Sequence, residues 1–111
     1  MGLSTHILDT AIGRPAANVS LALSKFDGGS WYEIGRGATD ADGRCKTLLG
    51  DASLEAATYK IHFAVAEYYS AQKLTGLYPF IEITFTVTEP SQHHHIPLLL
   101  TANGYTTYRG S

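Results

Sequence analysis

The sequence is poor in the features that mark secreted, membrane-bound or nucleic-acid-binding proteins. Its one cysteine, Cys45, excludes an internal disulfide and fits a reducing compartment such as the cytoplasm. No apolar segment is long enough to span a bilayer, and the N-terminal residues lack the basic start and apolar stretch of a signal peptide. The chain has no basic run and a formal net charge of −2, so nucleic-acid binding lacks its electrostatic basis. We therefore expect a cytoplasmic protein with no membrane partner and no nucleic-acid partner.

Charged residues are also scarce. They make up 16% of the chain against 44% for hydrophobic residues, and this composition favours the burial of surface in an oligomer. The length of 111 residues suits one domain with its own core, and the sequence contains no linker and no internal repeat. We therefore expect a single domain over residues 1–111 that associates with copies of itself.

What the chain does contain is the periodicity of β-strands. In the segments 19–24, 59–66 and 81–88, apolar residues alternate with small or polar residues, so each strand has one apolar face. Gly28-Gly29 predicts a hairpin turn, and residues 40–43 predict a second turn. Short strands separated by turns predict an all-β protein, namely a two-sheet antiparallel sandwich.

Other segments depart from the strand pattern. We expect a short helix at 67–74 closed by Gly76, and a further helical turn within 49–57. Pro97 interrupts the apolar run 96–100, which predicts an edge strand or a bulge there. Because a small sandwich has a filled core, we expect any ligand site at loop ends or between subunits.

Histidines form the first group of candidate chemical residues. His6 lies in a short apolar strand, where it is either a solvent-exposed edge residue or a general base, because the unperturbed pKa of an imidazole, roughly 6.5, suits proton transfer near neutral pH. His93, His94 and His95 are consecutive, so in a strand His93 and His95 share one face and His94 takes the other. Two imidazoles on one face could bind zinc with His6 as a third ligand; alternatively, the triplet is only the polar end of a strand.

Arg44 and Cys45 follow the predicted turn at 40–43. An arginine aimed off a loop is either solvated or binds an anion, and its guanidinium suits a planar ligand rich in carbonyl groups. No activating group lies near Cys45 in sequence, so packing is a better interpretation of this residue than nucleophilic catalysis.

The C-terminal residues 105–111 alternate aromatic and polar side chains and finish on an arginine, a glycine and a hydroxyl. Most termini are frayed and polar, whereas this composition indicates a terminus that is placed in a site. Tyr108 and Ser111 are therefore candidates. Together with the histidines and Arg44 they make a plausible set of acid, base and oxyanion-stabilising groups.

Three motifs stand out along the chain. The first is LSTHILDT at 3–10 with GRPA at 13–16, the second is TDADGR at 39–44, and the third is HHHIPLLL at 93–100 with GYTTYRGS at 104–111. These motifs resemble those of the 5-hydroxyisourate hydrolases, the enzyme relatives of transthyretin. The YRGS end is the most specific piece, because it separates the hydrolases from transthyretin, which is a hormone carrier. Two departures, His94 where the family often has tyrosine and Thr101-Ala102 where it often has Ser-Pro, touch no candidate position.

The resemblance implies a transthyretin-like sandwich of about eight strands with one short helix. It also implies a homotetramer (a dimer of dimers) with sites in a channel between subunits, and the cofactor-independent hydrolysis of 5-hydroxyisourate in urate degradation. The resemblance places catalytic roles on His6, Arg44, His95 and Ser111. It places substrate binding on His6, Arg44 and Tyr108, and it assigns no metal.

Two other functions remain open at this point. A transthyretin-like carrier would hold a small aromatic ligand in the channel and would need no histidine pair, no arginine and no YRGS end. A zinc protein built on His6, His93 and His95 would bind the metal stoichiometrically and would lose stability to a chelator.

Overall fold

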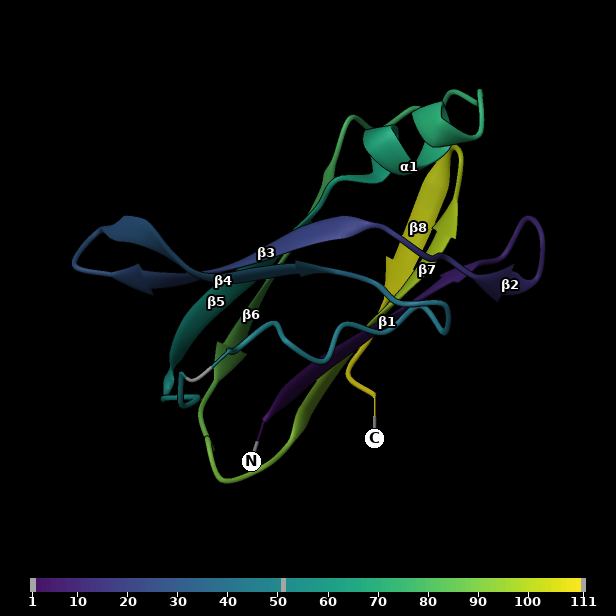
Figure 1. Ribbon diagram of the computed structural model, residues 1–111. Helices are drawn as coiled ribbons and strands as arrows, with labels where there is room; N and C mark the ends of the chain where they lie inside the picture. The colour runs from purple at the N-terminus through teal and green to yellow at the C-terminus, as the bar shows by residue number, and fades with distance from the viewer. Residues whose placement is uncertain (1, 51, 111) are drawn as a thin grey trace.

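The computed structural model describes residues 2–50 and 52–110, and this part of the chain forms two four-stranded sheets and one short helix (Figure 1). The first sheet has the strand order β2-β1-β7-β8, and the second has the order β4-β3-β5-β6. The elements are β1 (Leu3–Asp9), β2 (Arg14–Pro15), β3 (Ser20–Asp27), β4 (Ser30–Ala38), β5 (Ala57–Phe63), α1 (Val65–Ala71), β6 (Ile81–Val87), β7 (His94–Thr101) and β8 (Gly104–Thr107). The predicted fold class, a two-sheet sandwich of about eight strands with a short helix, is confirmed.

The core lies between the two sheets and is built from the apolar positions of the alternating segments. Ile61 and Leu23 are fully buried in the second sheet, and Ile7 and Leu98 are fully buried in the first. Burial of each such side chain contributes roughly 1.5–3 kcal/mol. The alternate residues of these strands point outward, as exposed Ser20 does at the start of β3. The core therefore leaves the outer face of each sheet free to carry polar groups.

The hairpin predicted at Gly28-Gly29 is confirmed. Both glycines have positive φ, 60° and 84°, and they join β3 to β4 with Asp27 opposite Ser30. Positive φ at both central residues is the conformation that this two-residue turn requires. Phe26 and Trp31 then face each other across the strands, with ring centroids 5.1 Å apart.

One strand pair differs from the predicted antiparallel arrangement. β1 and β7 are parallel, with Ser4 opposite His95 and His6 opposite Pro97. Parallel neighbours need a long crossover, and here most of the chain lies between the two strands. Alternation within a strand predicts its faces but not its direction relative to a distant partner. The parallel register brings the two histidine-bearing segments side by side.

The prediction of an edge strand or bulge at Pro97 is wrong. β7 is an interior strand between β1 and β8, and its register with β1 is continuous. Pairing with β8 reaches only as far as Leu98 opposite Thr107, so Pro97 lies just beyond that ladder. The Thr107 hydroxyl donates to the Pro97 carbonyl oxygen at 2.7 Å. Proline, which has no backbone N–H, is tolerated at this position because Pro97 has no partner in the β8 ladder to which an N–H would donate.

The helix predictions need two corrections. Helix α1 begins and ends earlier than the predicted span 67–74, and Lys73 rather than Gly76 adopts the left-handed conformation after it, with φ of 61°. Residues 52–57 and the preceding segment 49–50 contain no helix; the chain makes a turn in which Gly50 N–H donates to Thr47 O at 3.0 Å. Buried Leu48 holds this segment against the sandwich, and that tertiary contact overrides local helix propensity. Over the described ranges, no helix has the length and hydrophobicity needed to cross a membrane.

Candidate active site

The candidate site lies on the outward face of the first sheet, where β1 and β7 run together. Alternation in β1 buries Thr5 and leaves Ser4 and His6 half-buried on the outer face. Alternation in β7 likewise buries His94 and turns His95 outward. Because Ser4 lies opposite His95, His6 is a diagonal neighbour of His95 on that face. The prediction that His94 points away from His95 is confirmed.

Arg44 joins this face through the turn predicted at 40–43. The Asp40 carboxylate accepts hydrogen bonds from the backbone N–H groups of Asp42 at 2.9 Å and of Arg44 at 3.0 Å. The Arg44 N–H is the main reason that the pKa of the Asp40 carboxyl lies below its ordinary 3.8. The turn then pairs Arg44 with His6 in an antiparallel bridge, so the side chains of the two residues share a face. Asp40 therefore organises the loop that presents the guanidinium.

Gly43 allows this loop to lie close to His6. It has φ of +74°, and its carbonyl oxygen accepts a 2.8 Å hydrogen bond from Ile7 N–H. A methyl group built on Gly43 would overlap the Ile7 carbonyl oxygen and would lie 3.3 Å from the His6 Cδ2 atom. Only glycine fits both the backbone conformation and the space.

The chain after β8 returns along β7 to the other side of His95. Gly110 N–H donates to the His95 carbonyl oxygen at 2.8 Å, and the two residues form an antiparallel bridge. A methyl group on Gly110 would overlap the His95 Cδ2 atom and would lie 3.1 Å from Cγ. The C-terminal segment is therefore placed against the candidate histidine. Ser111, which the resemblance assigns to catalysis, lies outside the described residues.

A hydroxyl links two of the histidines. The Ser4 Oγ atom is 2.8 Å from His93 Nε2 and 2.7 Å from His95 Nδ1. The prediction that His93 and His95 share a face is confirmed by this common partner. The pKa of His95 lies below its ordinary 6.5, first because of burial and then because of electrostatic repulsion from Arg44, His6 and His93, against a smaller opposing effect of a hydrogen bond to the Ser4 backbone. His95 is therefore a neutral imidazole near pH 7, which a general base must be.

Tyr108 lies elsewhere in this single chain. Its side chain is 56% exposed and lines a hollow of about 310 Å³ beside β6 and β7, together with Ile83, Ile96 and His94. The structure thus brings His6, Arg44 and His95 together on one face and places Tyr108 on a different surface. Its assignment to substrate binding stays a prediction.

Cys45 and the metal alternative can be compared with the structure directly. Cys45 is buried, with its sulfur atom 3.8 Å from the Thr47 hydroxyl, in agreement with a packing role. Among the residues that the structure describes, no group of three histidine, cysteine or acidic side chains is arranged to hold a metal ion. Zinc binding at the histidines therefore has no ligand set within that part of the chain.

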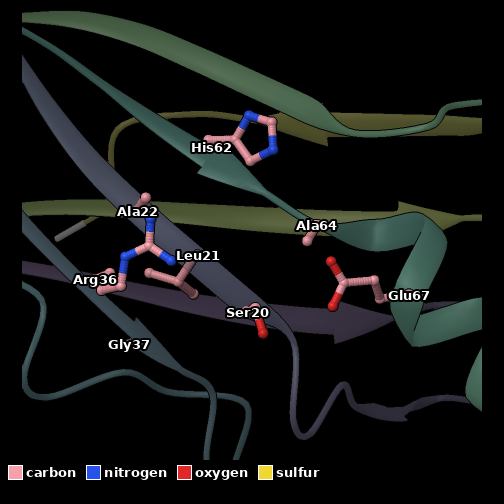
Figure 2. A pocket seen from close by; sticks show the side chains of 8 residues that line it. All are labelled: Ser20, Leu21, Ala22, Arg36, Gly37, His62, Ala64 and Glu67. Atoms are coloured by element: carbon pink, nitrogen blue, oxygen red, sulfur yellow. The ribbon is translucent and has the colours of Figure 1, made fainter. Parts of the chain in front are cut away.

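A second polar hollow lies on the outer face of the other sheet (Figure 2). It has a volume of about 340 Å³ and includes Arg36, His62 and Glu67. Arg36 donates two hydrogen bonds to Glu33, at 2.8 and 2.7 Å, and His62 Nδ1 is 3.0 Å from a Glu82 carboxylate oxygen. Its two basic groups are thus already paired with carboxylates, and none of the candidate site residues lies there.

Sequence reasoning misses three residues that build the site: Ser4, Gly43 and Gly110. Ser4 has a readable signal, since it lies two positions before His6 and therefore on the same face of a strand. The two glycines belong to the second and third motifs, but they matter because the backbone there lies close to the His6 and His95 side chains. A local sequence pattern does not predict such a close approach between distant segments.

Known proteins are similar to this chain in sequence and in fold. Residues 3–110 match the model of the HIUase/Transthyretin family. The chain is 41% identical over 111 residues to the 5-hydroxyisourate hydrolase of Mus musculus, an alignment that covers 98% of this chain and 94% of the mouse protein.

Two solved structures illustrate the range of the fold. Sea bream transthyretin in complex with thyroxine is similar with a TM-score of 0.91 at 32% identity, over 97% of this chain and 93% of that chain. The 5-hydroxyisourate hydrolase of Klebsiella pneumoniae is similar with a TM-score of 0.85 at 31% identity, over 98% of both chains. The fold alone therefore does not separate a ligand-binding protein from a hydrolase, and the side chains on the outer face must do so.

Proposed function

The chain belongs to the HIUase/Transthyretin family, and on this premise we propose that it acts as a 5-hydroxyisourate hydrolase in urate degradation. The observation that supports this activity is the meeting of His6, Arg44 and His95 on one face of the first sheet. A carrier of small aromatic ligands has no use for this combination of bases and cation. Hydrolysis of a cyclic amide needs a base to activate water, a proton donor and a stabiliser of the oxyanion, and these three groups can supply them.

In the proposed reaction a water molecule attacks a ring carbonyl carbon of 5-hydroxyisourate. His95 Nε2 accepts a proton from the water as the new carbon–oxygen bond forms, because the neutral state of His95 and the Ser4 contact at Nδ1 leave that atom available. Arg44 stabilises the developing oxyanion and holds the ring carbonyl groups. His6 donates a proton to the ring nitrogen as the carbon–nitrogen bond breaks, which opens the six-membered ring to a carboxylate product. The family resemblance also gives Tyr108 and Ser111 the role of orienting the substrate, and Tyr108, which lies on a different surface of the single chain, would reach it from a neighbouring subunit.

The test is the decay of 5-hydroxyisourate, generated in place from urate by urate oxidase, with a chelator in every sample. We expect the protein to accelerate the decay, and His6→Gln and Arg44→Ala to lower kcat/KM by about 10²-fold or more. His62→Gln is the matched control, because His62 lies on the outer face of the other sheet and should leave the rate unchanged. A folded protein that leaves spontaneous decay unaltered would show that the fold is present without the hydrolase chemistry.

We further propose that the protein is a homotetramer, a dimer of dimers, in the cytoplasm. Tyr105 and Tyr108 are 42% and 56% exposed near β8, and Leu8 and Leu99 lie opposite each other on the outer face of the first sheet. Burial of this apolar surface favours association. The buried free thiol of Cys45 suits a reducing compartment. Sedimentation should give a mass of about 48 kDa, four times 12.0 kDa, and a 12.0 kDa species would contradict the tetramer.

A further inference from the structure

The candidate base, His95, is linked through a serine hydroxyl to a second histidine, His93. The Ser4 hydroxyl is within hydrogen-bond distance of both His95 Nδ1 and His93 Nε2, at 2.7 and 2.8 Å. His95 is half-buried, whereas His93 is exposed to solvent. We propose that Ser4 and His93 form a proton relay that passes the charge acquired by His95 during hydrolysis to the solvent-exposed imidazole of His93. This inference rests on the proposed hydrolase function.

The hydrogen-bonding capacity of the three groups permits the relay. A serine hydroxyl has one hydrogen and two lone pairs, so it donates to one imidazole while it accepts from the other. In the starting state His95 Nδ1–H donates to Ser4 Oγ, Ser4 O–H donates to His93 Nε2, and His95 Nε2 is free. This arrangement leaves the substrate-side nitrogen of His95 ready to accept a proton.

The protons then move in one direction along the chain of groups. When His95 Nε2 takes a proton from the attacking water, the Nδ1 proton passes to Ser4 Oγ and the original Ser4 proton passes to His93 Nε2. His95 is again neutral, with its hydrogen on Nε2, and His93 carries the positive charge. Two protons then return in the reverse order, from His93 Nε2 to Ser4 Oγ and from Ser4 to His95 Nδ1, and the His95 Nε2 proton is released to bulk water. His6 takes a proton from bulk water to replace the one it gave to the ring nitrogen, and the site is ready for the next turnover.

The electrostatics of the site favour this transfer. The charged and titratable groups that act on His95 are Arg44, His6 and His93, and burial adds to their effect against a positive charge on His95. A cation on exposed His93 is hydrated by solvent, whereas a cation on His95 is partly desolvated and lies near the Arg44 guanidinium. After His95 has taken the proton from water, the relay therefore stabilises the site by moving the positive charge from His95 to His93.

If Ser4 had a purely structural role, changes at His93 would have no effect on catalysis. A hydroxyl that only holds the His95 ring would need no second imidazole on its other side. Ser4 is thus a positioning residue for His95 in either case, but only the relay gives His93 a share in catalysis. This difference makes the two interpretations separable by experiment.

The kinetic test uses Ser4→Ala, Ser4→Thr and His93→Gln. We expect Ser4→Ala and His93→Gln each to lower kcat about tenfold with KM unchanged, a part of the roughly 10²–10⁴ that general acid–base catalysis supplies. The double variant should be no slower than either single variant, because both changes interrupt one path. Ser4→Thr should restore the rate. Ser24→Ala on β3 and His62→Gln on β5 are matched controls on the other sheet.

The pH profile gives a second readout. A hydroxyl oxygen that accepts from His95 Nδ1–H favours the protonated imidazole, so Ser4→Ala should move the acid limb of kcat/KM to lower pH, whereas Ser4→Thr should leave it in place. A Ser4→Ala enzyme with wild-type kcat and an unmoved profile would overturn the proposal. A slow Ser4→Ala enzyme beside a His93→Gln enzyme of normal rate would also overturn it, since the path would then end at Ser4.

Nitrogen-15 NMR of the imidazoles separates failure of the relay from failure of the hydrolase function. Neutral His95 should carry its hydrogen on Nδ1, facing Ser4, and Ser4→Ala should change the nitrogen shifts of both His95 Nδ1 and His93 Nε2, whether or not the protein hydrolyses 5-hydroxyisourate. This pattern in an inactive wild-type protein would reject the hydrolase function and keep the proton path. A neutral His95 with its hydrogen on Nε2 in an active wild-type enzyme would reject the relay and keep the hydrolase.

Discussion

Gly110→Ala should impair the enzyme while leaving the sandwich folded. The backbone conformation at Gly110 is one that alanine can adopt, so the effect of the change is steric. The added methyl group would overlap the Cδ2 atom of the His95 ring and would approach its Cγ and Cβ atoms to 3.1 and 3.3 Å. An ordinary carbon–carbon contact of about 3.5 Å then requires a displacement of about 1 Å. Either the ring or the C-terminal segment must move.

Both movements reduce activity. Displacement of a catalytic group by about 1 Å can cost about 10²-fold in rate, which corresponds to about 2.7 kcal/mol of transition-state stabilisation. Departure of the C-terminal segment would break the 2.8 Å hydrogen bond from Gly110 N–H to the His95 carbonyl oxygen, a net loss of about 1 kcal/mol. That loss should lower the melting temperature by no more than about 5 °C, because Gly110 contributes nothing to the buried core.

The assay is kcat/KM for 5-hydroxyisourate decay, with thermal unfolding measured on the same samples. Gly104→Ala is the matched control, since a methyl group there meets only the Thr101 hydroxyl oxygen at 3.5 Å, an ordinary contact. We expect the control to retain the wild-type rate. Equal rates for Gly110→Ala, Gly104→Ala and the wild type would refute the argument that close packing of the C-terminal segment positions His95.

Three further predictions test other parts of the structure. Arg44→Lys should lower kcat/KM by about 10²-fold or less, and Arg44→Ala by about 10²–10³-fold, because an ammonium keeps the charge but loses the paired geometry; a Lys variant with the wild-type rate would remove the oxyanion role. Asp40→Asn should weaken the turn and the activity at neutral pH. Because the pKa of Asp40 is lowered in the folded state, its contribution to stability is present above the ordinary value of 3.8 and is lost as pH falls through the lower folded value, so urea unfolding of the Asn variant should lack that pH dependence. Tyr69→Phe should raise the free energy of unfolding by about 1 kcal/mol, because the buried Tyr69 hydroxyl has no hydrogen-bond partner among the described atoms. Tyr59→Phe is its counterpart and should be destabilising, since the Tyr59 hydroxyl bonds to the backbone of Glu55 at 2.9 Å in both directions.

The parts of the fold that follow from local pattern were predictable. The buried face of β5 is the alternating set that includes Tyr59, Ile61 and Phe63, and the Gly28-Gly29 turn forms where two positive φ values are needed. The errors lie where tertiary contacts decide. Helix α1 starts as soon as β5 ends, and Pro97 is tolerated in an interior strand because the β8 ladder stops short of it.

The sequence by itself determined which residues are candidates for the chemistry, through the motifs that contain His6, Arg44 and His95, and it determined which face of each strand is apolar. Only the tertiary structure decided that these residues meet. Ser4 and His95 are 91 positions apart, and their hydrogen bond depends on a parallel pairing of β1 with β7. Periodicity encodes the faces of one strand, because successive side chains alternate. The partner, direction and register of a distant strand are set by the packing of the whole core, and so is the space that only Gly43 and Gly110 can leave.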